Sequence, residues 1–136
     1  MNASMIGLKQ SVHRVPLIVL GLGLILAGCE SLDAYEGPRQ PRNELAQITG
    51  DTRLGGNLPI TLIIRRVDEL DLGLRYRGAF VLPDEHDLLI DCTVTESKQT
   101  SRHHLHVDVN AGETYRLTAT TGPGNRSCAE VQLVAR

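Results

Sequence analysis

Apolar and polar residues alternate along the second half of the chain. In the segment that begins at Leu88, the side chains of Leu88, Ile90, Cys92 and Val94 fall on one side of an extended backbone, and mainly polar residues fall on the other. A period of two is the pattern of a half-buried β-strand, because successive side chains point to opposite faces of a sheet. The segment is therefore predicted to be a strand with Cys92 facing the core.

A second alternating segment covers residues 103–109. Its predicted inward face consists of His103, Leu105, Val107 and Val109. Asn110-Ala111-Gly112 follows, a composition typical of a tight turn, and a further alternating run contains Tyr115 and Leu117. The two runs are predicted to pair as a β-hairpin with a short loop.

Shorter apolar runs, bounded by Gly, Pro, Asn and Asp, predict further strands. They cover residues 44–48, 59–67, 76–82 and 128–134. The last of these is expected to return beside the strand that contains Cys92. Six to eight short strands with turns at such intervals predict an all-β fold, a small antiparallel β-sandwich.

The N-terminal segment has a different pattern. Lys9 and Arg14 precede residues 15–27, an uncharged apolar run 13 residues long that ends in Leu26-Ala27-Gly28-Cys29. A helix needs about 20 residues to cross a bilayer, and a charged start before a short apolar run is typical of a signal peptide. The final four residues resemble the bacterial lipobox, which implies cleavage before Cys29 and a lipid on its thiol. A plain signal peptide and a buried apolar segment are the alternatives.

Three parts of the chain are predicted on this basis. Residues 1–28 form a cleaved signal peptide, residues 29–42 a flexible lipidated tether, and residues 43–136 the β-sandwich domain. More than one acyl chain makes attachment stable, so the mature chain is expected to sit on a membrane without spanning it. Glu30 follows the cysteine, whereas an aspartate there resembles the inner-membrane retention signal of enteric bacteria. We therefore expect the outer membrane, on its periplasmic side.

Composition narrows the function classes. From Cys29 onward the chain has 12 basic and 16 acidic residues, a formal charge of −4, whereas a nucleic-acid-binding surface would need the opposite balance. One Phe, three Tyr and no Trp supply few aromatic rings for stacking. No nucleic-acid partner is predicted. The chain also lacks a serine elbow and a phosphate-binding glycine loop, and we do not expect an enzyme.

Cys92 and Cys128 remain as an even pair once Cys29 is set aside. In an exported chain the simplest use of such a pair is a disulfide. It would close a loop of roughly 35 residues and contribute about 3 to 4 kcal/mol in the chain-entropy model. Zinc binding or nucleophilic catalysis would need partners at ligand or triad spacing, which neither cysteine has.

His104, His106 and Asp108 are the candidate metal ligands, because they share the outward face of their predicted strand. Two imidazoles and a carboxylate could bind zinc or copper. Arg102 on the same face argues against a cation there. We interpret the face as a solvent-exposed polar surface, and no cofactor is predicted.

Two further charged groups are interpreted as ordinary surface. Asp84-Glu85-x-Asp87, with Asp91 beyond it, lacks the spacing of a calcium loop and is interpreted as a solvated turn. Arg65-Arg66 and Arg75-x-Arg77 could engage lipid phosphates or an acidic partner. Strict strand alternation, however, would send Arg65 and Arg66 to opposite faces of their sheet.

Several short motifs resemble those of a group of small, mostly uncharacterised bacterial lipoproteins. They are Cys29 followed by Tyr35-Glu36-Gly37-Pro38, Pro41 and Glu44-Leu45-Ala46, then Leu82-Pro83-Asp84-Glu85-His86 and Gly112-Glu113-Thr114-Tyr115. The second half is also similar to small β-sandwich modules of the PEGA kind. Both usually have Leu-Pro-Gly-x-His, and here Asp84 stands at the glycine. The resemblance implies a β-sandwich lipoprotein and assigns no catalytic residue.

Two function classes are left open. The first is an envelope structural or interaction protein, in which lipid holds the β-sandwich at the membrane and an exposed sheet edge or loop binds another protein. The second is a small module or accessory enzyme that binds a metal or an envelope polymer through the face of His104 and His106. The size of the domain and the missing catalytic motifs favour the first.

Overall fold

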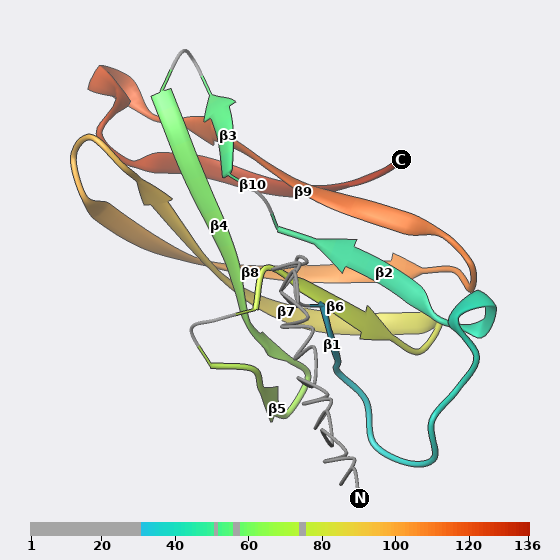
Figure 1. Cartoon of the computed structure of the whole chain (residues 1–136). Helices are drawn as coiled ribbons and strands as arrows, with labels where there is room; N and C mark the ends of the chain where they lie inside the picture. Colours follow the sequence, from blue (N-terminus) through green and yellow to red (C-terminus); the bar gives the residue numbers. More distant parts are fainter. Residues whose placement is uncertain (1–30, 51, 56–57, 74–75) are drawn as a thin grey trace, which may run out of the picture.

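The computed structural model describes residues 31–136, apart from residues 51, 56–57 and 74–75. The predicted signal peptide and Cys29 lie outside these residues. Within them, ten strands form two sheets that pack face to face (Figure 1). The prediction of an all-β sandwich is confirmed, although short strands raise the number above the predicted six to eight. The described part of the chain contains no helix that is long and apolar enough to span a bilayer.

The first sheet has the strand order β1-β6-β2-β9-β10. Its strands are β1 (Ser31–Asp33), β6 (Gly78–Val81), β2 (Ala46–Thr49), β9 (Thr114–Thr121) and β10 (Cys128–Ala135). The pairs β1–β6 and β2–β9 are parallel, whereas β2–β6 and β9–β10 are antiparallel. The sheet is therefore mixed.

The second sheet has the order β3-β4-β7-β8, with β5 paired to one end of β4, and its pairs are antiparallel. Its strands are β3 (Thr52–Gly55), β4 (Leu58–Val67), β5 (Leu70–Asp71), β7 (Asp84–Val94) and β8 (Gln99–Val109). Two short 3-10 helices, η1 (Arg42–Glu44) and η2 (Pro123–Asn125), lie in connections between strands.

An aliphatic core lies between the sheets. The predicted inward face of β7 is confirmed, because Leu88, Ile90, Cys92 and Val94 are each at most 1% exposed. The first sheet contributes Ala46, Ile48, Ala79, Val81 and Leu117 to the same cluster. Tyr115 is the aromatic residue of this buried cluster among the described residues, and the other members are aliphatic side chains and the two cysteines. Burial of a Val, Leu or Ile side chain stabilises a fold by about 1.5 to 3 kcal/mol, so a mainly aliphatic core can hold this domain together.

The ordered domain begins earlier than predicted. Ser31–Asp33 pairs with β6, and Ala34 is buried in the core, with its backbone nitrogen donating to the carbonyl of Phe80 at 2.8 Å. Arg42 binds Asp33 at 2.6 Å and stacks on the Phe80 ring. The prediction of a flexible tether up to residue 42 was therefore wrong from Ser31 onward. The segment was predicted to be a tether because most of its residues are polar, but Leu32 and Ala34 pack against the core.

The predicted hairpin between residues 103–109 and the strand of Tyr115 was also wrong. β8 belongs to the second sheet and β9 to the first, so the Asn110–Gly112 turn crosses between the sheets. The backbone nitrogen of Gly112 donates to the carbonyl of Leu45, which ties the turn to the segment before β2. β10 likewise pairs with β9 and not with β7, contrary to the expectation that the last strand returns beside Cys92.

Cys92 and Cys128 form the predicted disulfide, with their Cα atoms 6.2 Å apart. Cys92 lies on β7 in the second sheet and Cys128 begins β10 in the first. The bond therefore crosses the core and joins the two layers of the sandwich.

Candidate functional site

The outer side of β7 and β8 carries most of the chemistry predicted from the sequence. Register pairs Glu85 with Asp108, Asp87 with His106, Leu89 with His104, and Asp91 with Arg102. We call these eight residues the charged face. The predicted common orientation of His104, His106 and Asp108 is confirmed, because all three are exposed while their neighbours along β8 are less so.

Asp91 lies between two arginines on this face. Its carboxylate accepts a hydrogen bond from Nε of Arg102 at 3.0 Å and lies 3.5 Å from Nη1 of Arg65. The side chain is largely buried although it points away from the core. Two guanidinium groups compensate for the lost hydration of the carboxylate. Asp91 thus joins two arginines from neighbouring strands on the outer side of the sheet.

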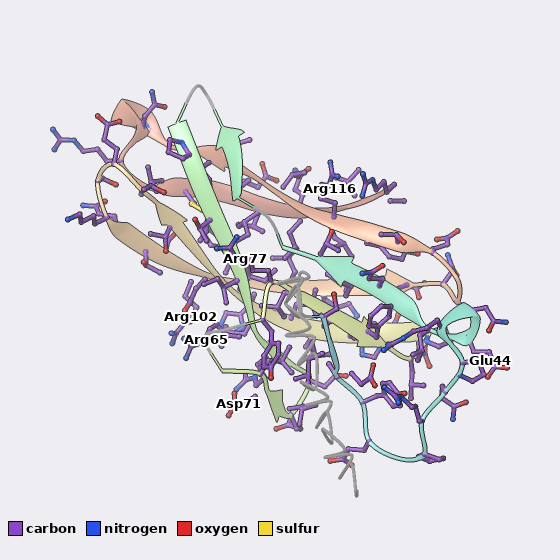
Figure 2. All side chains as sticks on the ribbon, in the orientation of Figure 1. Glu44, Arg65, Asp71, Arg77, Arg102 and Arg116 are labelled. Carbon is purple, nitrogen blue, oxygen red and sulfur yellow. A yellow bond between two sulfur atoms is a disulfide. The ribbon has the colours of Figure 1, made fainter. Side chains whose placement is uncertain are left out.

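A β-bulge places both Arg65 and Arg66 on the outer side of the sheet. Ile64 pairs with Ile90 and Arg66 with Leu89, which leaves Arg65 as the extra residue of β4. Arg65 contacts Asp91, and Figure 2 shows it beside Arg102. The expectation that Arg65 and Arg66 point to opposite faces was wrong, because alternation fails at a bulge.

His106 is the most strongly partnered histidine of the charged face. Its Nδ1 donates to Asp87 Oδ1 at 2.9 Å, and Nε2 lies 3.7 Å from a carboxylate oxygen of Glu85. The hydrogen bond to Asp87 raises the pKa of His106, and the negative charges of Asp87, Glu85 and Asp108 act in the same direction. The imidazole is therefore held as a cation over a wider pH range than a free histidine.

The same face contains an open recess of about 330 Å³. It is lined by Arg66, Asp87, Leu88, Leu89, His104, Leu105 and His106. A cation, a carboxylate and two imidazoles thus surround the half-buried Leu89. This pattern of polar groups around an apolar centre is typical of small contact sites for a partner.

The arrangement does not favour the metal alternative. Within the described ranges, no group of three or more His, Cys, Asp or Glu residues is placed to hold a metal ion. His106 is directed at Asp87 and Glu85, whereas His104 lies opposite the apolar Leu89. The structure therefore does not bring His104, His106 and Asp108 together around one point.

His86 is a buried polar residue whose hydrogen-bond partners were not predicted from the sequence. Nε2 lies 2.6 Å from the carbonyl oxygen of Leu82, and Nδ1 lies 2.6 Å from Oδ2 of Asp68. Burial acts to raise the pKa of Asp68, but hydrogen bonds from His86 and from the backbone of Asp87, with the charge of His86, lower it overall. The Leu-Pro-x-x-His motif thus fastens the start of β7 to the turn after β4.

The Gly-x-x-Tyr motif fastens a second turn. The Tyr115 hydroxyl accepts a hydrogen bond from the backbone nitrogen of Asn110 at 2.9 Å and donates one to the Glu113 carboxylate. The hydrogen bond from Tyr115 lowers the pKa of Glu113, and Asn110 adds to the effect. Gly112 has a φ of 77°, which glycine adopts without strain. Both motifs therefore hold turns of the fold in place.

Sequence reasoning missed the pairing of Asp91 with Arg102. The sequence could have shown it, because a turn near Ser97 fixes an antiparallel register in which these residues oppose each other.

Cys29, the predicted lipid site, lies outside the described residues. Comparison with known proteins finds no matching family model, no matching curated protein and no matching solved structure. The function is therefore inferred from the residues and geometry of the chain.

Proposed function

We propose that the chain is a lipoprotein of the bacterial cell envelope, anchored through Cys29, whose β-sandwich binds another protein through the charged face. The observation that carries the interaction is the ordered array of opposite charges on β7 and β8, in which Asp91 contacts Arg65 and Arg102 and His106 contacts Asp87. Such arrays steer a complementary partner and fix its orientation. No enzymatic activity is proposed.

The position of β8 supports the same surface. β8 ends the strand order of the second sheet, so no described strand pairs with its outer edge. It has eleven residues, from Gln99 to Val109, which is long for an edge strand. An extended segment of a partner can add to such an edge through main-chain hydrogen bonds. Contacts with Arg102, His104 and His106 would then give specificity.

The strand that follows Cys29 in the sequence and the charged face belong to different sheets of the sandwich. Cys29 is two residues before β1, which belongs to the first sheet, whereas β7 and β8 belong to the second. A lipid on Cys29 therefore leaves the charged face accessible. Glu30, next to the lipidated cysteine, supports a place in the outer membrane, facing the periplasm.

We also propose membership of the group of small lipoproteins that the motifs resemble, with a PEGA-like domain. The backbone of Asp84 supports this, since its φ of 139° lies in a region that favours glycine, the residue usual at this position of the motif. The turn contacts of His86 and Tyr115 explain why a shared fold would need the motif residues.

A site-specific photo-crosslinker in the full-length chain, expressed with its signal peptide and Cys29, tests the interaction. We expect a discrete adduct when the crosslinker replaces His104, which is exposed on the charged face. The matched control replaces Gln132, which is exposed on β10 of the other sheet. Glu85→Lys, which reverses the charge of an exposed side chain on the same face, should reduce the adduct formed from His104. The same adduct from both positions, or none from His104, would refute the proposed surface.

A further inference from the structure

Three arginines line one hollow in the first sheet. Arg77 precedes β6, Arg116 lies on β9 and Arg136 follows β10, and the hollow between them measures about 210 Å³. Its other lining residues are Ser31, Thr49, Gly50 and Gly78. We call it the arginine hollow. Among the residues that the structure describes, no Asp or Glu lines the hollow.

Strand pairing assembles the hollow from distant parts of the sequence. Ser31 on β1 pairs with Gly78 on β6, Gly78 pairs with Thr49 on β2, and Thr49 pairs with Arg116 on β9. These residues form one row across four strands. Figure 2 labels Arg77 and Arg116, which reach the hollow from separate elements. The hollow therefore results from the fold and not from a local run of basic residues.

Gly78 lets the Ser31 side chain pack closely against the backbone of β6 in this row. A Cβ atom at Gly78 would stand 2.6 Å from Oγ of Ser31, so any side chain would compete with Ser31 for space. Two hydroxyl-bearing residues, Ser31 and Thr49, flank the glycine. The lining of the hollow therefore combines glycines, two hydroxyl-bearing residues and three arginines.

Arg77 and Arg136 differ from other arginines of the chain in their ion pairs. Arg42, Arg65 and Arg102 each contact an aspartate. Among the described residues, no salt bridge joins Arg77 or Arg136 to an acidic side chain. Arg116 already has an interaction within the protein, so its contribution is the charge near the hollow. Guanidinium groups bind phosphate oxygens through paired hydrogen bonds.

The hollow lies beside the proposed lipid anchor. Ser31 lines it, and Cys29 is two residues earlier, a separation that an extended chain spans in at most about 7 Å. Lipid on Cys29 would hold the hollow at the level of the lipid headgroups. Pockets for drug-sized ligands measure roughly 300 to 1,000 Å³, so a smaller hollow fits a single charged group.

We infer that the arginine hollow binds the phosphate of an anionic lipid headgroup next to the anchored Cys29. This inference rests on the proposed lipid anchor and adds a second contact with the same membrane. An acyl chain alone fixes position but leaves the domain free to rotate. A phosphate held by Arg77 and Arg136 fixes the orientation of the first sheet against the membrane, which turns the charged face of the second sheet outward.

Chemical modification of arginine in the native lipidated protein tests this inference. The protein is inserted into vesicles of phosphatidylcholine alone or with phosphatidylglycerol, treated with phenylglyoxal and mapped by mass spectrometry. Phosphatidylglycerol should slow modification of Arg77 and Arg136 by roughly five-fold, the factor expected for one basic residue at an anionic surface. Arg126, which is exposed and does not line the hollow, is the internal control and should be unaffected.

Each of the following outcomes would overturn the inference. Equal rates in the two kinds of vesicle would show that the hollow does not bind an anionic headgroup. Equal protection by inorganic phosphate in neutral detergent, at the same phosphate concentration, would assign the hollow to free phosphate. The same peptide maps report lipid on Cys29. Lipid there with Arg77 unprotected overturns the hollow alone, whereas absence of lipid overturns the anchor and the hollow together.

Discussion

The backbone of Asp84 has a positive φ, a conformation that is strained for a residue other than glycine. Its φ of 139° is strained for any residue with a Cβ atom, although its carboxylate accepts a hydrogen bond from the Glu85 nitrogen at 2.9 Å. We expect Asp84→Gly to stabilise the fold by about 1 kcal/mol in denaturant unfolding, after the entropic cost of glycine is subtracted. Asp84→Ala is the matched control and should give no gain. A less stable glycine variant would contradict the assignment of strain.

His106 should titrate above the usual histidine value of about 6.5. In the folded state the hydrogen bond to Asp87 raises the pKa of His106. The contribution of His106 to stability is therefore complete below pH 6.5 and is lost as the pH rises through the raised value. An NMR titration of the histidine ring protons measures this directly. Asp87→Asn should lower the pKa, and Asp108→Asn should lower it less. A pKa at or below 6.5 in the unmodified chain would contradict the contact.

At Gly50 the backbone packs closely against the backbone of β4 in the second sheet and of the residue before β6 in the first. A Cβ atom there would lie 2.6 Å from the backbone oxygen of Leu62 on β4 and 3.0 Å from that of Arg77. Backbone atoms cannot rotate away, so we expect Gly50→Ala to destabilise the fold by about 1 to 3 kcal/mol. Gly122→Ala is the control, because its nearest contact would be an ordinary 3.6 Å. Thermal unfolding of the two variants tests this, and equal melting temperatures would refute it.

The faces of the strands could be predicted from the sequence, but their partners could not. Alternation placed Cys92 and its neighbours inward on β7 and His104 outward on β8, as the structure confirms. Whether Asn110–Gly112 closes a hairpin or crosses between sheets depends on contacts with Leu45, far away in the sequence. The bulge at Arg65 also could not be predicted from the alternation, because it is a feature of how β4 pairs with β7.

The arginine hollow could not be predicted from the sequence for the same reason, because it depends on which strands are neighbours. Its residues come from β1, β2, β6, β9 and the end of the chain, and no short motif contains more than two of them. The sequence did show Arg77 within Arg75-x-Arg77, but not its meeting with Arg116 and Arg136. Long-range pairing created that surface, so only the fold could reveal it.

For the whole molecule, the disulfide is the largest single covalent constraint. Cys92 and Cys128 are 36 residues apart, a separation for which the chain-entropy model gives about 4 kcal/mol. We expect the double variant Cys92→Ala/Cys128→Ala to melt roughly 15 to 30 °C lower, since 1 kcal/mol shifts a domain of this size by about 4 to 8 °C. Reduction of the unmodified protein should produce a similar shift. A melting temperature that neither treatment changes would contradict a stabilising cross-link.

Lipid on Cys29 underlies the proposed place of the protein, the exposure of its charged face and the orientation set by the arginine hollow. Metabolic labelling with palmitate, followed by immunoprecipitation of the full-length gene product, tests it most directly. We predict a labelled protein shortened by the first 28 residues, and an unlabelled, unprocessed protein in Cys29→Ser. The double variant at Cys92 and Cys128 should keep the label. Label that persists in Cys29→Ser, or its absence from the unmodified chain, would contradict the account.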